Sequence, residues 1–192
     1  MQGNRTKWRK LILELIPAIV LIALVVIDQI TKLHVKGLAE STTWTKTVVI
    51  PNFFEFRFTM NSGAAFSFLA NVSWGQLFFK ILTPVALILF GVFYFYLYKK
   101  GYKWAKYAMA FIVAGTIGNF IDRLAYDSVI DFISLIFGDY YFPIFNLADT
   151  FMTVGIIMIL VHFCFLDENA LFKKKKKEIK SDEEVQDGNN GK

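Results

Sequence analysis

The sequence predicts an α-helical polytopic membrane protein, with four transmembrane helices and a small β-sheet at the outer membrane face between the first two helices. Three observations support this prediction. Of 192 residues, 55% are hydrophobic, 17% are aromatic and only 19% are charged, and a soluble domain of this size could not bury so much apolar surface. Four stretches are apolar over about 20 residues, the length that a helix needs to cross a bilayer. The basic residues flank these stretches.

The four apolar stretches are expected to be membrane-spanning helices. The first begins after a basic segment, but it continues into Asp28-Gln-Ile-Thr-Lys32 and not into a small-residue cleavage site. This pattern favours a retained helix over a cleaved signal peptide. The expected spans are residues 11–30, 78–98, 107–124 and 148–166.

Lysine and arginine residues predict the orientation, because they gather in the short cytoplasmic loops of membrane proteins. Of 21 such residues, four lie in residues 1–10, four in 99–106 and seven in 167–192, whereas 33–77 and 125–147 together contain three. We therefore expect both termini to be cytoplasmic and the two longer segments to face outward. A nucleic-acid-binding surface would interleave basic, polar and aromatic residues, so no nucleic-acid partner is expected.

The first outer segment has the pattern of short strands. Residues 47–50, 53–59 and 64–68 are expected strands, separated by turn-forming residues. In the second of them, Phe alternates with polar residues, which predicts one apolar face and one polar face that carries Glu55, Arg57 and Thr59. A short interfacial helix is expected at 70–77.

The chain is expected to form one membrane domain, residues 1–170, with its β-rich part at about 45–68. Residues 171–192 form a charged segment without apolar periodicity. Such a composition is typical of disorder, and we expect this segment to be a cytoplasmic tail.

Charged side chains in or near membrane spans are costly and mark functional sites. Asp28 and Lys32 are four residues apart and can pair on one helix face, either as a structural pair or in support of a site. Glu14 and Lys80 lie near span ends and are expected to reach water or headgroups. A further group gathers at the outer membrane level, from the third helix, the fourth helix and the loop between them: Asn119, Asp122, Arg123, Asp131, Asn146 and Asp149.

Carboxylates are the chemistry that this group offers. His34 and His162 fall on opposite sides of the membrane in this topology, so no histidine-based zinc site is expected, and we expect no metal or cofactor. Two aspartates that face each other share one proton. One of them can then activate a water molecule while the other donates a proton to the carbonyl oxygen or leaving amine of a peptide. A polar network that merely packs the helices is the alternative.

Four blocks of the sequence occur together, in a fixed order, between the expected spans. They are Asp28-Gln-Ile-Thr-Lys32, Asn61-Ser-Gly-Ala-Ala-Phe-Ser67, Gly118-Asn-Phe-Ile-Asp-Arg123 with Val129-Ile-Asp131-Phe132, and Phe145-Asn-Leu-Ala-Asp149. Over about residues 11–166 the chain closely resembles lipoprotein signal peptidase (signal peptidase II), a family of bacterial membrane aspartic proteases. The resemblance implies removal of a prolipoprotein signal peptide on the N-terminal side of a diacylglyceryl-modified cysteine, in the bacterial cytoplasmic (inner) membrane.

The resemblance also implies roles for individual residues. It makes Asp131 and Asp149 the catalytic pair, and the β-rich segment a cradle over the site. Its implied partners are lipid-modified prolipoproteins and membrane lipids, and we expect no obligate protein partner. Asp127 is a departure, since the family usually has Gly there, although Asp tolerates left-handed turn geometry. The implied support residues are Asp28, Lys32, Asn61, Gly63, Asn119, Asp122, Arg123 and Asn146.

Within this scheme the two catalytic candidates have different environments. Asp149 lies at the start of the fourth helix, where free backbone N–H groups and the helix dipole favour a carboxylate. Asp131 has apolar neighbours, and desolvation disfavours its charged form. We therefore expect Asp149 to be the ionised base and Asp131 the protonated partner. Asp122 is expected to hold the end of the third helix through Asn119 and neighbouring backbone groups.

Two other classes of protein fit parts of the pattern. A small four-helix ion or solute transporter subunit would use the acidic residues to bind a cation, but it would place them near the bilayer midplane. A membrane scaffold would leave both aspartates replaceable. The expected position of all the acidic residues at one interface favours the peptidase.

Overall fold

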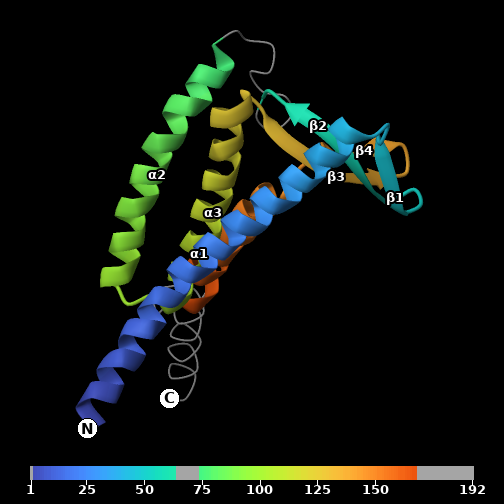
Figure 1. Ribbon diagram of the computed structural model, residues 1–192. Coiled ribbons are helices and arrows are strands. Elements are labelled where there is room, and N and C mark those ends of the chain that lie inside the picture. The colour runs from blue at the N-terminus through green and yellow to red at the C-terminus, as the bar shows by residue number, and fades with distance from the viewer. Residues whose placement is uncertain (1, 64–73, 168–192) are drawn as a thin grey trace, which may run out of the picture.

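Four helices and a small sheet make up the described part of the computed structural model, residues 2–63 and 74–167 (Figure 1). Each helix is long and apolar enough to cross a membrane, and the four predicted spans are confirmed in this respect. The helices are α1 (Gln2–Ser41), α2 (Gly75–Lys99), α3 (Lys103–Tyr126) and α4 (Leu147–Val161), which continues into the π-helix η2 (His162–Leu166).

The central helix is α3, which contacts α1, α2 and α4. In the apolar stretch of α3 that is long enough to span a membrane, 50% of the residues are buried, against 11% or less in the other helices. Glycines let the helices approach closely, as is common in membrane bundles. An added Cβ at Gly118 would lie 3.2 Å from the Cβ of Ala148, for example. As a result, the start of α4 lies beside the C-terminal half of α3.

The sheet has four antiparallel strands in the order β1-β2-β3-β4. Two strands from the first outer segment, which the sequence predicted, pair with two from the second. In Figure 1 the sheet lies at one end of the bundle, against the end of α1. The strands are β1 (Lys46–Ile50), β2 (Phe54–Asn61), β3 (Val129–Phe137) and β4 (Tyr140–Tyr141).

The expectation of a loop around Asp131 was wrong, because this residue lies within β3. The first four residues of β3, Val129 to Phe132, are all buried. A strand that is buried on both faces has no alternation of apolar and polar residues, so the sequence pattern did not reveal it.

Glu55 also differs from its prediction. Its side chain was expected on the polar face of the strand, yet the residue is only 2% exposed. One carboxylate oxygen pairs with Lys46 Nζ at 2.9 Å. The alternation of a strand shows which residues share a face but not whether that face is covered, and residues on both faces of β2 are partly buried.

Several element boundaries differ from those expected. Helix α1 continues to Ser41, so Asp28 and Lys32 lie well inside it and not near its end. Residues 75–77 belong to α2 and not to a separate interfacial helix. The expected strand at 64–68, residues 70–73 and the tail at 171–192 lie outside the described residues.

Glu14 and Lys80, which were expected to reach water or headgroups, each make an ion pair within the protein. Glu14 Oε2 lies 2.6 Å from Lys106 Nζ and connects α1 with α3. Lys80 Nζ lies 2.7 Å from Asp127 Oδ1 and connects α2 with the end of α3. The polar ends of the spans therefore contribute contacts between helices.

Candidate active site

The two candidate catalytic aspartates come from different elements. Asp131 lies in β3, opposite Thr59 of β2, where two residues of β2 face one of β3 in a β-bulge. Asp149 lies in the first turn of α4. Its carboxylate accepts from the backbone N–H of Asn146 at 3.2 Å, and the Asn146 side chain accepts from the Asp149 N–H at 3.0 Å. This reciprocal pair is a capping box that fixes the start of the helix.

Asn146 connects the two aspartates. Its side-chain oxygen accepts from the backbone of Asp149, while its side-chain nitrogen donates to Asp131 Oδ1 at 2.7 Å. The same nitrogen lies 3.0 Å from the Asn119 side-chain oxygen. Asn146 is completely buried, so its orientation is held by these contacts, and the carboxyl group of Asp131 and the backbone of Asp149 are held relative to the same side chain.

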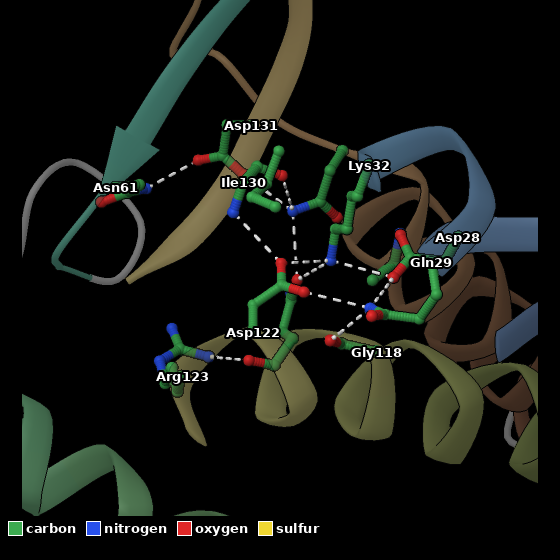
Figure 2. A network of polar contacts seen from close by, with 12 residues as sticks. Asp28, Gln29, Lys32, Asn61, Gly118, Asp122, Arg123, Ile130 and Asp131 are labelled. Carbon is green, nitrogen blue, oxygen red and sulfur yellow. Dashed lines mark hydrogen bonds and ion pairs between the residues drawn. The ribbon is translucent and has the colours of Figure 1, made fainter. Parts of the chain in front are cut away.

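Two further amides complete the surroundings of the aspartates. Asn119 on α3 donates to Asp149 Oδ1 at 2.8 Å. Asn61 at the end of β2 donates to Asp131 Oδ2 at 2.8 Å, as Figure 2 shows. Each aspartate therefore accepts from two N–H groups, and side-chain amides can meet either a charged or a neutral carboxyl group.

A buried ion cluster lies next to the aspartates. Lys32 Nζ lies 2.9 Å from Asp28 Oδ2 and 3.0 Å from Asp122 Oδ2, and all three side chains are at most 1% exposed. The same ammonium donates to Asn119 Oδ1 at 2.9 Å. The predicted pairing of Asp28 with Lys32 is confirmed (Figure 2), and the cluster orients the Asn119 amide that binds Asp149.

The acidic residues of this cluster also hold the backbone on either side of the site. Asp28 Oδ1 accepts from the Ala148 N–H at 2.9 Å, at the start of α4. Asp122 Oδ2 accepts from the Ile130 N–H at 3.1 Å, directly before Asp131. Asp122 was expected to act through Asn119 and neighbouring backbone groups; it bonds this backbone N–H, and its side-chain partners are Lys32 and Gln29 and not Asn119. It thus holds β3 and not only the end of α3.

Gln29 and Gly118 belong to the network although they were not among the candidates. The Gln29 side chain donates to Asp122 Oδ1 at 3.0 Å and to the Gly118 backbone oxygen at 3.1 Å. A Cβ at Gly118 would collide with Asp28 Oδ2. Both residues lie inside the sequence blocks that contain Asp28 and Asn119, so their position next to the candidates was the available signal.

Arg123 has weaker contacts than the other site residues. Its guanidinium donates to the backbone oxygens of Asn119 and Gly63 at 3.4 Å each and lies 4.9 Å from the centre of the Phe79 ring. Its buried Nε has no hydrogen-bond acceptor among the described residues. Among the described residues, the guanidinium donors of Arg123 are therefore the least satisfied of the site. The Gly63 N–H donates to the Asn61 side chain at 2.9 Å.

Burial raises the pKa of Asp131 from its ordinary value of 3.8 to about 7. The nearby negative charge of Asp149 acts in the same direction, while hydrogen bonds from Asn61 and Asn146 and the charge of Lys32 oppose it. Desolvation prevails because the residue is only 2% exposed. Near neutral pH, Asp131 is therefore poised to hold or release a proton.

All ten candidate residues lie in this network of hydrogen bonds and ion pairs at one end of the bundle. Asp127, the departure from the family pattern, ends α3 with φ 52°. This left-handed conformation is one that Asp adopts more readily than most residues, so the turn is retained as predicted.

Comparisons with known proteins give the same family as the four blocks. Residues 20–165 match the family model described as signal peptidase (SPase) II. A lipoprotein signal peptidase of Listeria welshimeri is 37% identical over 78% of this chain and 93% of its own length. That of Maridesulfovibrio salexigens is 35% identical over 76% of this chain and 92% of its own.

A solved structure is also similar. A bacterial membrane enzyme determined by the in meso method at 2.3 Å resolution has a TM-score of 0.62 and 32% sequence identity, over 76% of this chain and 85% of that chain. The transporter interpretation gains no support from these comparisons. The chain belongs to the signal peptidase II family of lipoprotein-processing aspartic endopeptidases.

Proposed function

We propose that Asp131 and Asp149 are the catalytic pair, and that they hydrolyse the peptide bond with one shared proton. The observation that carries this proposal is the position of Asn146, which bonds the side chain of Asp131 and forms the capping box with Asp149. One buried residue thus donates to both carboxyl groups, to Asp131 through its side-chain nitrogen and to Asp149 through its backbone N–H. A pair of carboxyl groups with different environments is the usual arrangement for acid and base roles at neutral pH.

Asp149 is the ionised member in this proposal, and Asp131 is the protonated one. The capping box and the start of α4 supply N–H donors to the Asp149 carboxylate, whereas burial raises the pKa of Asp131 to about 7. Infrared titration of the protein tests the protonated role of Asp131, with Asp131→Asn to identify the band of its carboxyl group. We expect this group to lose its proton near pH 7, and loss of the proton near its ordinary pKa of 3.8 would contradict the assignment.

The proposed reaction consumes one water molecule and needs no covalent bond between the substrate and the enzyme. Asp149 takes a proton from water, and the resulting hydroxide attacks the carbonyl carbon of the scissile bond. Asp131 donates its proton to the carbonyl oxygen, which stabilises the tetrahedral intermediate. The carbonyl then re-forms, the C–N bond breaks, and the proton held by Asp149 passes to the leaving amine. The proton on the former carbonyl oxygen returns to Asp131, so the products are a carboxylic acid and an amine.

The proposed substrate is a prolipoprotein with a diacylglyceryl-modified cysteine, cleaved on the N-terminal side of this residue. The relatives are named lipoprotein signal peptidases, and the site lies at one end of the spanning helices, where a signal peptide would leave the membrane. Basic residues dominate the opposite end of the chain's helices, at residues 1–10 and 99–106. The positive-inside rule therefore supports a site at the outer face of the bacterial cytoplasmic membrane.

Mass spectrometry of the cleavage products tests the substrate and the cleavage position. The purified protein is incubated with a prolipoprotein that carries the diacylglyceryl group and with the same chain without it. We expect a product that begins with the lipid-modified cysteine, formed only from the first substrate. Equal cleavage of both chains, or a product with a different first residue, would contradict the proposal.

A further inference from the structure

An apolar cavity of about 310 Å³ lies between α1, α2 and α3. Its lining residues lie within 17–21 of α1, 87–94 of α2 and 109–113 of α3. These parts of the three helices lie away from the sheet, which is at the other end of the bundle (Figure 1). Leu21, which lines the cavity, and Lys32 of the active-site network are about 16 Å apart along the axis of α1. Its lining includes Pro17, Leu21, Phe90, Gly91, Met109 and Val113.

The cavity has a buried floor and an open rim. Pro17 and Met109 are buried at its base, while Ala18 and Gly91 at its edge are exposed. A Cβ at Gly91 would meet no atom within 4 Å, so a missing side chain leaves space here. All three helices are long and apolar enough to span a membrane, and the rim of the cavity would face hydrocarbon and not water.

Basic residues lie at the end of the cavity that is farthest from the active site. Lys106 is three residues before Met109 on α3, and it pairs with Glu14, which is three residues before Pro17 on α1. The Lys106 ammonium also lies 4.4 Å from the centre of the Tyr98 ring. Lys99 and Lys100 at the end of α2 are exposed, and neither has a carboxylate within 4.0 Å among the described residues.

We propose that this cavity binds one acyl chain of an anionic phospholipid from the leaflet opposite the active site. The phosphate group lies near Lys106 at the end of the cavity, and Lys99 and Lys100 at the end of α2 add positive charge beyond what the single carboxylate of Glu14 balances. Basic clusters beside spanning helices attract anionic headgroups. The acyl chain lies along the apolar wall formed by the three helices.

The dimensions of the cavity favour an acyl chain over a peptide helix. A helix with its side chains is about 10–12 Å across. A cavity of about 310 Å³ would therefore contain about 3–4 Å of its length, or two to three residues. An alkyl chain is a single file of methylene groups and fits a narrow groove. Since an acyl chain leaves an equally apolar bilayer, burial alone gives little affinity, and the charges at the cavity end must supply the selectivity.

Electron paramagnetic resonance of spin-labelled lipids tests this proposal. The protein is placed in nanodiscs that contain phosphatidylglycerol or phosphatidylcholine, each spin-labelled in an acyl chain. We expect an immobilised component with phosphatidylglycerol that is weaker with phosphatidylcholine. Gly91→Leu fills the cavity and should remove this component. Gly37→Leu is the matched control, because it also adds a side chain where no atom lies within 4 Å of the Cβ, but outside the cavity.

Two charge variants separate a headgroup site from a purely structural ion pair. Lys106→Gln should lower the preference for phosphatidylglycerol about five-fold, the effect of about 1 kcal/mol per basic residue, whereas Glu14→Gln should retain or raise it. Equal losses in both variants would show that the pair only holds α1 to α3, and would overturn the proposal. An immobilised component that persists in Gly91→Leu, or that a synthetic signal peptide displaces, would also overturn it.

Discussion

The side-chain nitrogen of Asn119 donates a hydrogen bond of 2.8 Å to Asp149 across the contact between α3 and α4. The oxygen of the same amide accepts from the Lys32 ammonium at 2.9 Å. Since Lys32 also pairs with Asp28 and Asp122, one side chain separates the buried ion cluster from the candidate base. Changes in the cluster should therefore reach the active site through Asn119.

Lys32→Met should destabilise the protein by about 3–5 kcal/mol, the cost of removing one partner from a buried charge network. The Asp28 and Asp122 carboxylates would remain buried without their ammonium. Equilibrium unfolding in mixed micelles measures the effect. Lys36→Met is the control on the same helix, because its ion pair with Glu40 is partly exposed, and it should change the stability little. Similar losses in both variants would contradict the proposed role of the cluster.

Gly118→Ala should lower both stability and activity. Its methyl group would collide with Asp28 Oδ2 and displace a carboxylate that bonds Lys32 and the start of α4. Overpacking of this kind costs about 1–3 kcal/mol. Gly37→Ala, also in a helix but with no atom within 4 Å of the added carbon, should stabilise by about 0.5–1 kcal/mol. Thermal unfolding compares the two variants, and an unchanged Gly118→Ala protein would show that the close contact is not required.

Arg123→Ala should weaken substrate binding more than catalysis. The guanidinium makes only long contacts of 3.4 Å and has a buried Nε without an acceptor among the described residues, so its donors are suited to a backbone carbonyl or a lipid ester. A hydrogen bond to a charged group contributes about 1.5–3 kcal/mol, and KM should rise at least about ten-fold. Steady-state kinetics measures this. A fall in kcat at constant KM would contradict the binding role.

The proton on Asp131 gives the stability a predictable pH dependence. Its pKa is raised from 3.8 to about 7 in the folded protein, so between these values the folded state keeps a proton that the unfolded state releases. The free energy of unfolding should therefore fall as the pH rises through this window, and then level off above about pH 7. Asp131→Asn removes this contribution, and its unfolding should depend less on pH. Identical pH profiles for the two proteins would contradict the raised pKa.

The candidate residues were predictable because their chemistry is costly in a membrane. Asp28, Lys32 and Asp122 are charged side chains in or near expected spans, and such residues are rare unless they pair. Their pairing across α1 and α3 through one ammonium follows from the three-dimensional packing. The sequence indicated which residues were unusual, and the structure shows that they form a single network.

The missed features have physical reasons as well. Strand β3 lacks alternation because Val129 to Phe132 are all buried, and a continuous apolar run does not distinguish a strand from other buried segments. Glu55 was expected on an exposed polar face because alternation shows which residues share a face but not whether that face is covered. Gln29 was missed because the candidates were chosen by the energetic cost of a charge in the membrane, and this side chain is uncharged, although it bonds Asp122.

The most direct test of the catalytic pair is single-turnover cleavage of a lipid-modified prolipoprotein by Asp131→Asn and Asp149→Asn. Each variant keeps the size of the side chain but removes one carboxyl group, so the cycle of proton transfers cannot be completed. Asp139→Asn is the matched control, because Asp139 is exposed between β3 and β4. We expect no detectable cleavage by the first two proteins and full cleavage by the control. Substantial turnover by either Asp131→Asn or Asp149→Asn would contradict the assignment.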